Sequence, residues 1–138
     1  MPGVDRQLAL ARLWLSKART DLALATVILE KGPEMEPWVA AFHAQQAAEK
    51  AVKGLLVLRR IDPPAVHNLV ALHALLPAEI ADIGVSMQSL ASLSKFARGV
   101  RYVVGLDQSD EPTWEEAEAA VVDADAILRA ATARIGPR

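Results

Sequence analysis

The chain has 138 residues, a length typical of one domain, and residues 1–138 are interpreted as a single domain. Apolar residues make up 52% and charged residues 23%, a balance that excludes a disordered or low-complexity chain. Fifteen basic and 17 acidic residues give a net charge of −2, so the surface as a whole is not one that attracts nucleic acid or anionic membranes.

A long amphipathic helix is predicted from Asp5, as its N-cap, to about Lys31. Its apolar residues alternate steps of three and four, which aligns them on one face: Leu8, Ala11, Leu15, Ala18, Leu22, Ala25 and Leu29. Gly32 and Pro33 end this helix, because glycine permits a left-handed cap and proline cannot continue the hydrogen-bond ladder.

A second long helix is predicted to begin at Pro37 and to run from Trp38 to Arg60. Proline suits the first position of a helix, where its missing N–H would have no helical partner. The apolar seam of this helix is rich in alanine, which lets neighbouring helices approach closely: Ala44, Ala48, Ala51, Leu55 and Leu58.

The middle of the chain is predicted to form two shorter helices. The first spans His67 to Leu76 and stops at Pro77, after which residues 78–85 form a turn or a single helical turn. The second begins at about Ser86, and its inward residues extend well beyond Arg98: Leu90, Leu93, Ala97, Val100 and Val104.

The last helix follows a loop over Gly105–Pro112. Thr113 and Glu116 have the spacing of a capping box, and the three-four apolar pattern then continues from Trp114 to Ile135. No segment shows the alternation of a strand. The sequence therefore predicts an all-α protein, an up-and-down bundle of four long or medium helices plus one short helix.

Several kinds of chemistry have no candidate residues. The chain contains no cysteine, and its three histidines do not lie three or four apart on one helix, so we expect no metal and no cofactor. It also lacks the glycine-rich phosphate loops and the G-x-S-x-G elbow of hydrolases. Charged residues interrupt every apolar run before it reaches membrane-spanning length, and we expect a cytoplasmic protein that does not associate with membranes.

Polar side chains form a second stripe on the predicted helix over 37–60. They recur at steps of three and four, next to the apolar seam: His43, Gln46, Lys50 and Lys53. A stripe of this kind most often faces water. The remainder of this helix is apolar enough to be buried on two or three sides, however, and a polar line there must be paired, hydrated or used for binding.

A basic cluster late in the chain is the second candidate. Arg98 and Arg101 share a helix face, with Lys95 and Tyr102 beside them. Two guanidinium groups match phosphate oxygens, and a tyrosine can stack on or hydrogen-bond a base. The alternative is that the arginines pair with the acidic face of the last helix: Glu115, Glu116 or Glu118.

The chain resembles the HEPN domain family over nearly its whole length. The most specific match is FHAQQAAEKAVKGLLV at 42–57. The other matching residues are Trp14-Leu15, Ala18, Asp21-Leu22, His67-Asn68-Leu69 and Arg101-Tyr102. The resemblance implies a helical bundle that forms a homodimer. It also implies nucleotide binding and a gene beside that of a minimal nucleotidyltransferase, often as a toxin-antitoxin pair.

Some members of this family are metal-independent ribonucleases whose active site contains an arginine followed four to six positions later by a histidine. Here Arg98 and Arg101 precede no histidine, since His73 is the last in the chain. Arg60 and His67 match the spacing formally, but the interval IDPPAV is a proline-stiffened loop rather than a late helix. The resemblance therefore favours a member without this catalytic motif.

Our leading hypothesis is a dimeric, noncatalytic HEPN-type bundle that binds a nucleotide, RNA or a nucleotidyltransferase partner. The predicted binding residues are His43, Gln46, Lys50, Lys53, Arg98, Arg101 and Tyr102. One alternative is a metal-independent RNA endonuclease in which His67 or His43 acts as general acid or base. The other is a structural dimerisation or interaction module whose polar stripe lines the interface between protomers.

Overall fold

The computed structural model describes residues 2–32, 34–98 and 111–136, and every regular element in these ranges is helical. The long helices are α1 (Pro2–Lys31), α2 (Pro37–Leu58) and α6 (Trp114–Ile135). Between α2 and α6 come the short helices α3 (Leu69–His73) and α4 (Met87–Ser94) and the 3₁₀ turns η1 (Ala78–Ile80) and η2 (Lys95–Arg98). The predicted all-α class, with four long or medium helices and one short helix, is confirmed.

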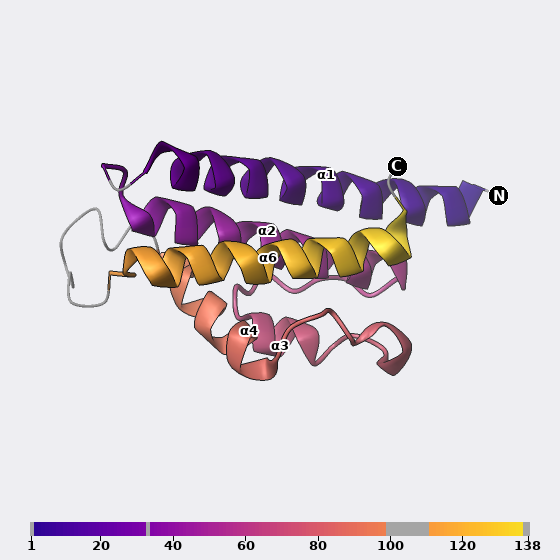
Figure 1. The fold of residues 1–138 in the computed structure, drawn as a ribbon. Helices are drawn as coiled ribbons and strands as arrows, with labels where there is room; N and C mark the ends of the chain where they lie inside the picture. Colours follow the sequence, from indigo (N-terminus) through magenta and orange to yellow (C-terminus); the bar gives the residue numbers. More distant parts are fainter. Residues whose placement is uncertain (1, 33, 99–110, 137–138) are drawn as a thin grey trace.

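The three long helices lie side by side and form the main layer of the bundle (Figure 1). α1 and α2 run in opposite directions, and α6 packs against both. The short elements α3, α4 and η2 form a second layer that packs on α2, on the side away from α1. Helix α2 is therefore covered on two sides, and polar groups on it need partners within the protein.

Small apolar side chains hold the long helices together. The predicted seam of α2 is inside as far as Leu55, since Ala44, Ala48, Ala51 and Leu55 have no exposed surface. Leu58, at the end of the helix, is partly buried. The centre of the predicted α1 seam is also fully buried: Ala11, Leu15, Ala18 and Ala25. At Gly54 an added Cβ would lie only 3.2 Å from the Ala11 carbonyl oxygen, so the absence of a side chain here lets α1 and α2 pack closely.

The N-terminus of the first helix differs from the prediction. Helix α1 begins at Pro2, three residues before the predicted cap at Asp5. Proline is tolerated in the first turn, and nothing between Pro2 and Asp5 stops the helix. At the other end the prediction is confirmed, because α1 stops at Lys31 and Gly32 has a left-handed φ of 98°.

Helix α2 ends at Leu58 instead of the predicted Arg60. The Ile61 N–H donates to the Leu56 carbonyl and the Arg60 N–H to the Val57 carbonyl, each at 2.9 Å. These two bonds form a Schellman motif, whose left-handed residue is usually glycine. Here that residue is Arg60, with φ 62°. The prediction was wrong because no glycine marks this helix end.

Helix α3 is shorter than the predicted span His67–Leu76. The Asn68 side chain accepts hydrogen bonds from the N–H groups of Val70 and Ala71, which makes Asn68 the N-cap and Leu69 the first helical residue. The helix already ends at His73. Of the two alternatives predicted for residues 78–85, a turn or a single helical turn, the helical turn is present as η1.

Helix α4 is also shorter than predicted. Ser86 is its N-cap, and the regular helix stops at Ser94 and tightens into η2. Val100 and Val104, and most of the loop predicted over 105–112, lie outside the described residues. The capping box of α6 is confirmed, since Thr113 and Glu116 exchange side-chain to backbone hydrogen bonds of 2.9 and 3.1 Å.

Candidate functional site

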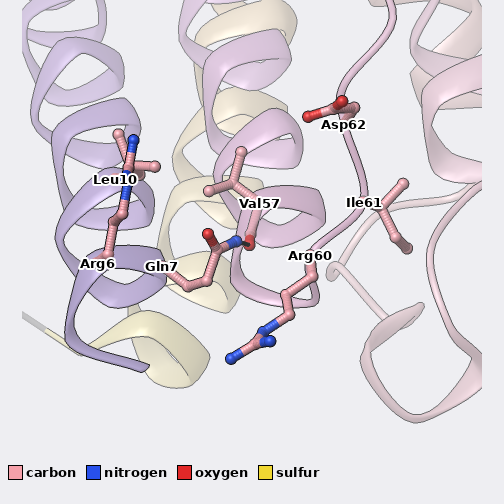
Figure 2. Close-up of a pocket in the computed structure, with 7 residues that line it drawn as sticks. All are labelled: Arg6, Gln7, Leu10, Val57, Arg60, Ile61 and Asp62. Carbon is pink, nitrogen blue, oxygen red and sulfur yellow. Dashed lines mark hydrogen bonds between the residues drawn. The ribbon is translucent and has the colours of Figure 1, made fainter. Parts of the chain in front are cut away.

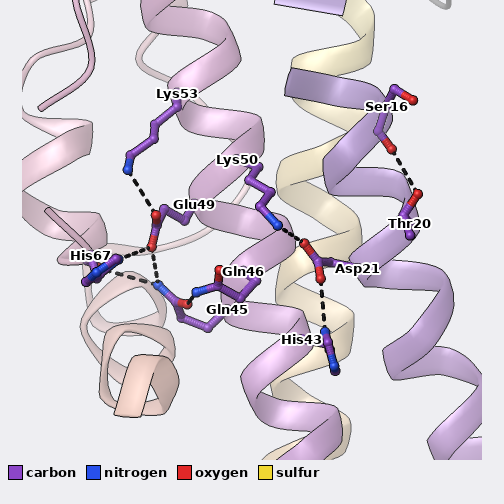
Figure 3. Close-up of polar contacts among 10 residues, drawn as sticks. All are labelled: Ser16, Thr20, Asp21, His43, Gln45, Gln46, Glu49, Lys50, Lys53 and His67. Atoms are coloured by element: carbon purple, nitrogen blue, oxygen red, sulfur yellow. Dashed lines mark hydrogen bonds and ion pairs between the residues drawn. The ribbon is translucent and has the colours of Figure 1, made fainter. Parts of the chain in front are cut away.

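Asp21 of α1 brings two residues of the predicted stripe together (Figure 3). Its Oδ1 lies 2.9 Å from Nδ1 of His43, and its Oδ2 accepts a hydrogen bond from Nζ of Lys50. The carboxylate is buried, whereas the side chains of His43 and Lys50 are 25% and 29% exposed. We call these three residues the Asp21 cluster. It lies at the seam between α1 and α2, with its two donor side chains partly exposed.

Glu49 organises a second set of contacts on the side of α2 that faces the segment before α3. Its Oε1 accepts from Gln45 at 3.1 Å and from Nδ1 of His67 at 3.0 Å, and its Oε2 accepts from Lys53 at 3.0 Å. We call Gln45, Glu49, Lys53 and His67 the Glu49 cluster. Burial raises the pKa of Glu49, but the hydrogen bonds from Gln45, Lys53 and His67 together outweigh it, so this pKa lies below its ordinary value.

Two neighbouring glutamines extend the Glu49 cluster toward the outer surface of α2. The Gln46 amide donates to the side-chain oxygen of Gln45 at 2.7 Å, and the Gln45 amide donates to the backbone carbonyl of His67 at 3.1 Å. Gln45 is fully buried and Gln46 is partly exposed. The amide pair therefore joins the outer surface of α2 to the segment that leads into α3.

Lys53 is the most deeply buried cation of the predicted stripe. Its side chain is 9% exposed, its ammonium group is paired with Glu49, and the same group lies 5.9 Å from the centre of the Trp14 ring on α1. A cation at this distance from an indole ring gains further electrostatic stabilisation. Lys53 is thus held between a carboxylate and an aromatic ring inside the bundle.

Both cluster histidines have the same arrangement. A carboxylate only accepts hydrogen bonds, so the Nδ1 atoms of His43 and His67 carry the donated protons and Nε2 is the other ring nitrogen. The His67 side chain is 66% exposed. Each imidazole is thereby oriented by a buried carboxylate, an arrangement suited to proton transfer or to binding an anion.

The predicted stripe is thus divided between two clusters and paired within the protein. His43 and Lys50 belong to the Asp21 cluster, whereas Gln46 contacts Gln45 and Lys53 pairs with Glu49. Sequence reasoning missed the carboxylates and the buried amide: Asp21, Gln45 and Glu49. The spacing of four from Gln45 to Glu49 and from Glu49 to Lys53 was a visible signal, but nothing in the sequence pairs Asp21 with α2.

The second predicted element of the site lies largely outside the described residues. Arg98 ends η2, and this turn packs against α2. Arg101 and Tyr102 fall in the undescribed range 99–110, so the guanidinium clamp stays a prediction. Of the alternative acidic partners, Glu116 is engaged in the capping box with Thr113.

The formal pair Arg60 and His67 is not brought together. Arg60 lies at the C-terminal end of α2 and lines a cleft there, whereas His67 contacts Glu49. At 1.5 Å rise per residue, Glu49 and Arg60 are roughly 16 Å apart along the helix axis. Among the described residues, no three acidic residues or histidines are grouped so as to hold a metal ion, and no helix has the length and apolarity to cross a membrane.

Comparison with known proteins places this bundle in a family. The family model of the HEPN domain matches residues 11–135, and the chain belongs to this family. A crystal structure of TT1696 from Thermus thermophilus is 32% identical, has a TM-score of 0.73, and the alignment covers 90% of this chain and 97% of that one.

A crystal structure of ST0689, described as an archaeal HEPN homologue, is 28% identical with a TM-score of 0.68. Its alignment covers 91% of this chain and 97% of that one. No curated protein matches this chain. The HEPN resemblance stated from the residues is therefore confirmed.

Proposed function

We propose that this HEPN domain is a noncatalytic, dimeric module that binds a nucleotide or RNA phosphate, or a minimal nucleotidyltransferase partner, through the exposed edge of α2. The contacting residues are His43, Gln46 and Lys50, with Arg98, Arg101 and Tyr102 from the end of the second layer. For Lys53, predicted as a binding residue, we propose a supporting role. Because it is buried against Glu49, it fixes the turn of α2 that carries the binding residues.

The observation that carries this proposal is the sharing of one carboxylate by two donors. Asp21 faces both Lys50 and His43, so the Asp21 cluster has a net positive charge whenever the imidazole is protonated. A phosphate oxygen is an acceptor of the same kind as a carboxylate oxygen, and it can take over one of these donors. Partial exposure of His43 and Lys50 leaves the approach to them open.

Two neighbouring groups supply recognition beyond charge. Gln46 uses its amide N–H on Gln45, and among the described residues no hydrogen bond to its side-chain oxygen is found. The Phe42 ring meets the His43 imidazole edge-on, with ring centroids 5.3 Å apart. These groups place an amide oxygen and an aromatic edge beside the cationic donors, where a base or sugar would lie.

Calorimetric titration with ATP, GTP and a short RNA tests this binding. Lys50→Ala is expected to weaken phosphate binding by about tenfold or more, the size of a charge-assisted hydrogen bond. Arg19→Ala is the control, because Arg19 is exposed on α1 outside both clusters. Failure of the wild-type chain to bind any of the three, alone and with its partner, contradicts the proposal.

The protein partner is proposed from membership of the family, in which a minimal nucleotidyltransferase is a frequent companion. A toxin-antitoxin role is the form this pairing often takes. The reading frames beside the gene and copurification from the native cell test both. A nucleotidyltransferase that elutes with the wild-type chain and is lost from Lys50→Ala supports the proposal, whereas a neighbouring nucleotidyltransferase that never copurifies contradicts it.

A second candidate function, metal-independent RNA cleavage, is favoured by one observation. Glu49 holds Nδ1 of His67 while most of the ring is exposed, which orients Nε2 toward solvent as a general acid or base requires. RNA incubated with the protein in EDTA tests this activity. His67→Gln and His43→Asn should abolish cleavage if it occurs, and His73→Gln is the control, since His73 contacts the Ala81 carbonyl.

The homodimer is proposed on the outer face of α1. Four large apolar side chains there are 40–55% exposed and form two pairs, each spaced by three residues: Leu10 with Leu13, and Leu24 with Val27. Leu24 lies one helical turn from Asp21, so a second copy seated on this face would border the Asp21 cluster. The structural alternative, an interface without a ligand, predicts the same dimer but no binding in the titrations above.

A further inference from the structure

A cleft of about 310 Å³ lies at the far end of the bundle, where α1 begins and α2 ends (Figure 2). Its lining comes from the first turns of α1 and from the residues around the end of α2: Arg6, Gln7, Leu10, Val57, Arg60, Ile61 and Asp62. Arg60 is ten residues beyond Lys50, about 15 Å along the helix axis. This cleft is therefore separate from the Asp21 cluster.

The cleft carries two arginines against one carboxylate. Arg6 and Arg60 are both exposed, and neither forms an ion pair within the described part of the chain. The adjacent Arg59 differs, because its guanidinium group is 2.6 Å from Glu79. Figure 2 shows Arg6 and Arg60 on opposite sides of the cleft, with Asp62 on a third side. Both side chains are exposed, and they must rotate for the two guanidinium groups to meet at one anion.

Arg60 occupies a backbone position that favours glycine. Its φ of 62° places it in the left-handed region, at the residue of the Schellman motif where glycine is usual. With this backbone conformation the two consecutive arginine side chains point in different directions. Arg59 pairs with Glu79, and Arg60 lines the cleft. A strained residue that keeps a long cationic side chain is the kind of outlier from which a functional role is inferred.

Other residues of the cleft add an acceptor and an apolar wall. The Gln7 side chain donates to the Val57 carbonyl at 2.6 Å, which ties α1 to the end of α2 and directs the amide oxygen away from that bond. Leu10, Val57 and Ile61 supply apolar surface beside the charges. The volume is at the lower end of the range for small-molecule sites.

We propose that this cleft binds a small organic phosphomonoester, with Arg6 and Arg60 on the phosphate and the apolar wall against the organic group. Arginine suits this task because its planar donors match phosphate oxygens and its charge does not depend on pH. The Gln7 oxygen is placed to accept from a hydroxyl or amino group of the ligand. This site does not depend on the function proposed for the Asp21 cluster.

Titration of the full chain with inorganic phosphate and with phenyl phosphate, followed by NMR or calorimetry, tests the proposal. Both should bind, and phenyl phosphate should bind more tightly because its ring covers the apolar wall. Arg60→Gly and Arg6→Gln are each expected to weaken binding by about 10-fold to 100-fold, as for loss of a charge-assisted hydrogen bond.

Two comparisons make the result decisive. In Arg60→Gly the melting temperature should not fall, because glycine suits the left-handed conformation, so lost binding is not explained by unfolding. Arg59→Gln removes the neighbouring charge and should keep full binding. Absence of binding by the wild type, or an equal loss in Arg59→Gln, overturns the site. Phenyl phosphate binding no more tightly than inorganic phosphate overturns the organic ligand.

Discussion

Glu49 and His67 are joined by a hydrogen bond of 3.0 Å between Oε1 and Nδ1, and their exposures are opposite: the Glu49 side chain is 6% exposed and the His67 side chain 66%. A buried acid thus fixes an imidazole that remains accessible. The same carboxylate neutralises Lys53 inside the bundle. The Glu49 cluster therefore pairs a buried lysine of α2 and also orients an exposed imidazole.

Glu49→Gln is predicted to destabilise the fold by about 3 kcal/mol, because it leaves the buried ammonium of Lys53 without a counter-charge. Urea denaturation at neutral pH measures this change. Glu79→Gln breaks the exposed pair with Arg59 and is the control, with an expected loss below about 1 kcal/mol. Equal losses of unfolding free energy in the two variants would show that the buried Glu49–Lys53 pair stabilises the fold no more than the exposed Arg59–Glu79 pair.

The stability of the wild-type chain should depend on Glu49 at acidic pH. Its pKa in the folded state lies below the ordinary value of 4.5, so the unfolded chain takes up the proton first. The stabilisation is therefore fully present above pH 4.5 and is lost as the pH falls through the lower, folded-state pKa. Measured by denaturation across this range, the difference between wild type and Glu49→Gln should narrow on acidification. A constant difference would contradict the assignment.

Thr113→Ala is predicted to cost about 1 kcal/mol through loss of the α6 cap. The Thr113 hydroxyl accepts the Glu116 N–H, which would otherwise have no helical partner. Thermal denaturation reports the change. Thr20→Ala, at an exposed position inside α1, is the matched control and should change stability by no more than about 0.5 kcal/mol.

Gly54→Ala is predicted to destabilise the protein by about 1 kcal/mol, although alanine favours a helix. The new Cβ would lie 3.2 Å from the Ala11 carbonyl oxygen and 3.2 Å from Cβ of Trp14. Both atoms belong to or adjoin the rigid backbone of α1, so α1 must shift away. Gly54→Val should cost more in the same denaturation assay, and a stabilised Gly54→Ala would show that α1 moves freely.

Leu13→Arg is predicted to convert the proposed dimer to a monomer, because it places a charge at the most exposed apolar position of the proposed α1 face. Sedimentation equilibrium gives the mass of the wild type and of the variant. Val122→Arg on α6 is the control, since Val122 is 68% exposed and lies outside that face. A wild-type chain that is monomeric at all concentrations refutes the dimer.

Hydrophobic periodicity was sufficient to predict the three long helices and their buried faces. Two local features carry this prediction: the three-four apolar spacing of α1 and α2, and the capping box of α6. Both depend only on residues that are close in the sequence. The ends that were predicted wrongly depend on contacts outside the local pattern. Arg60 ends α2 in a left-handed conformation that is unusual for arginine. Helix α3 begins later than predicted because Asn68 is its N-cap.

Only part of the candidate site could be predicted from the sequence. The polar stripe of α2 was found because its members share a face, and the expectation that such a line must be paired, hydrated or used for binding was met by pairing. The partner that organises its outer edge, Asp21, lies on another helix. Contacts between helices depend on how the helices pack, and the spacing of residues within one helix does not predict them.

The second layer has a mechanical consequence. The segment from α3 to η2 is built of short helices and packs mainly on one face of α2. Helices α1, α2 and α6, by contrast, each pack against the other two. Layers with fewer buried contacts open at a lower free energy than global unfolding requires. Local opening of this layer would break the hydrogen bond between Gln45 and the backbone carbonyl of His67. It would expose the side of α2 that faces away from α1, while α1, α2 and α6 stay packed together.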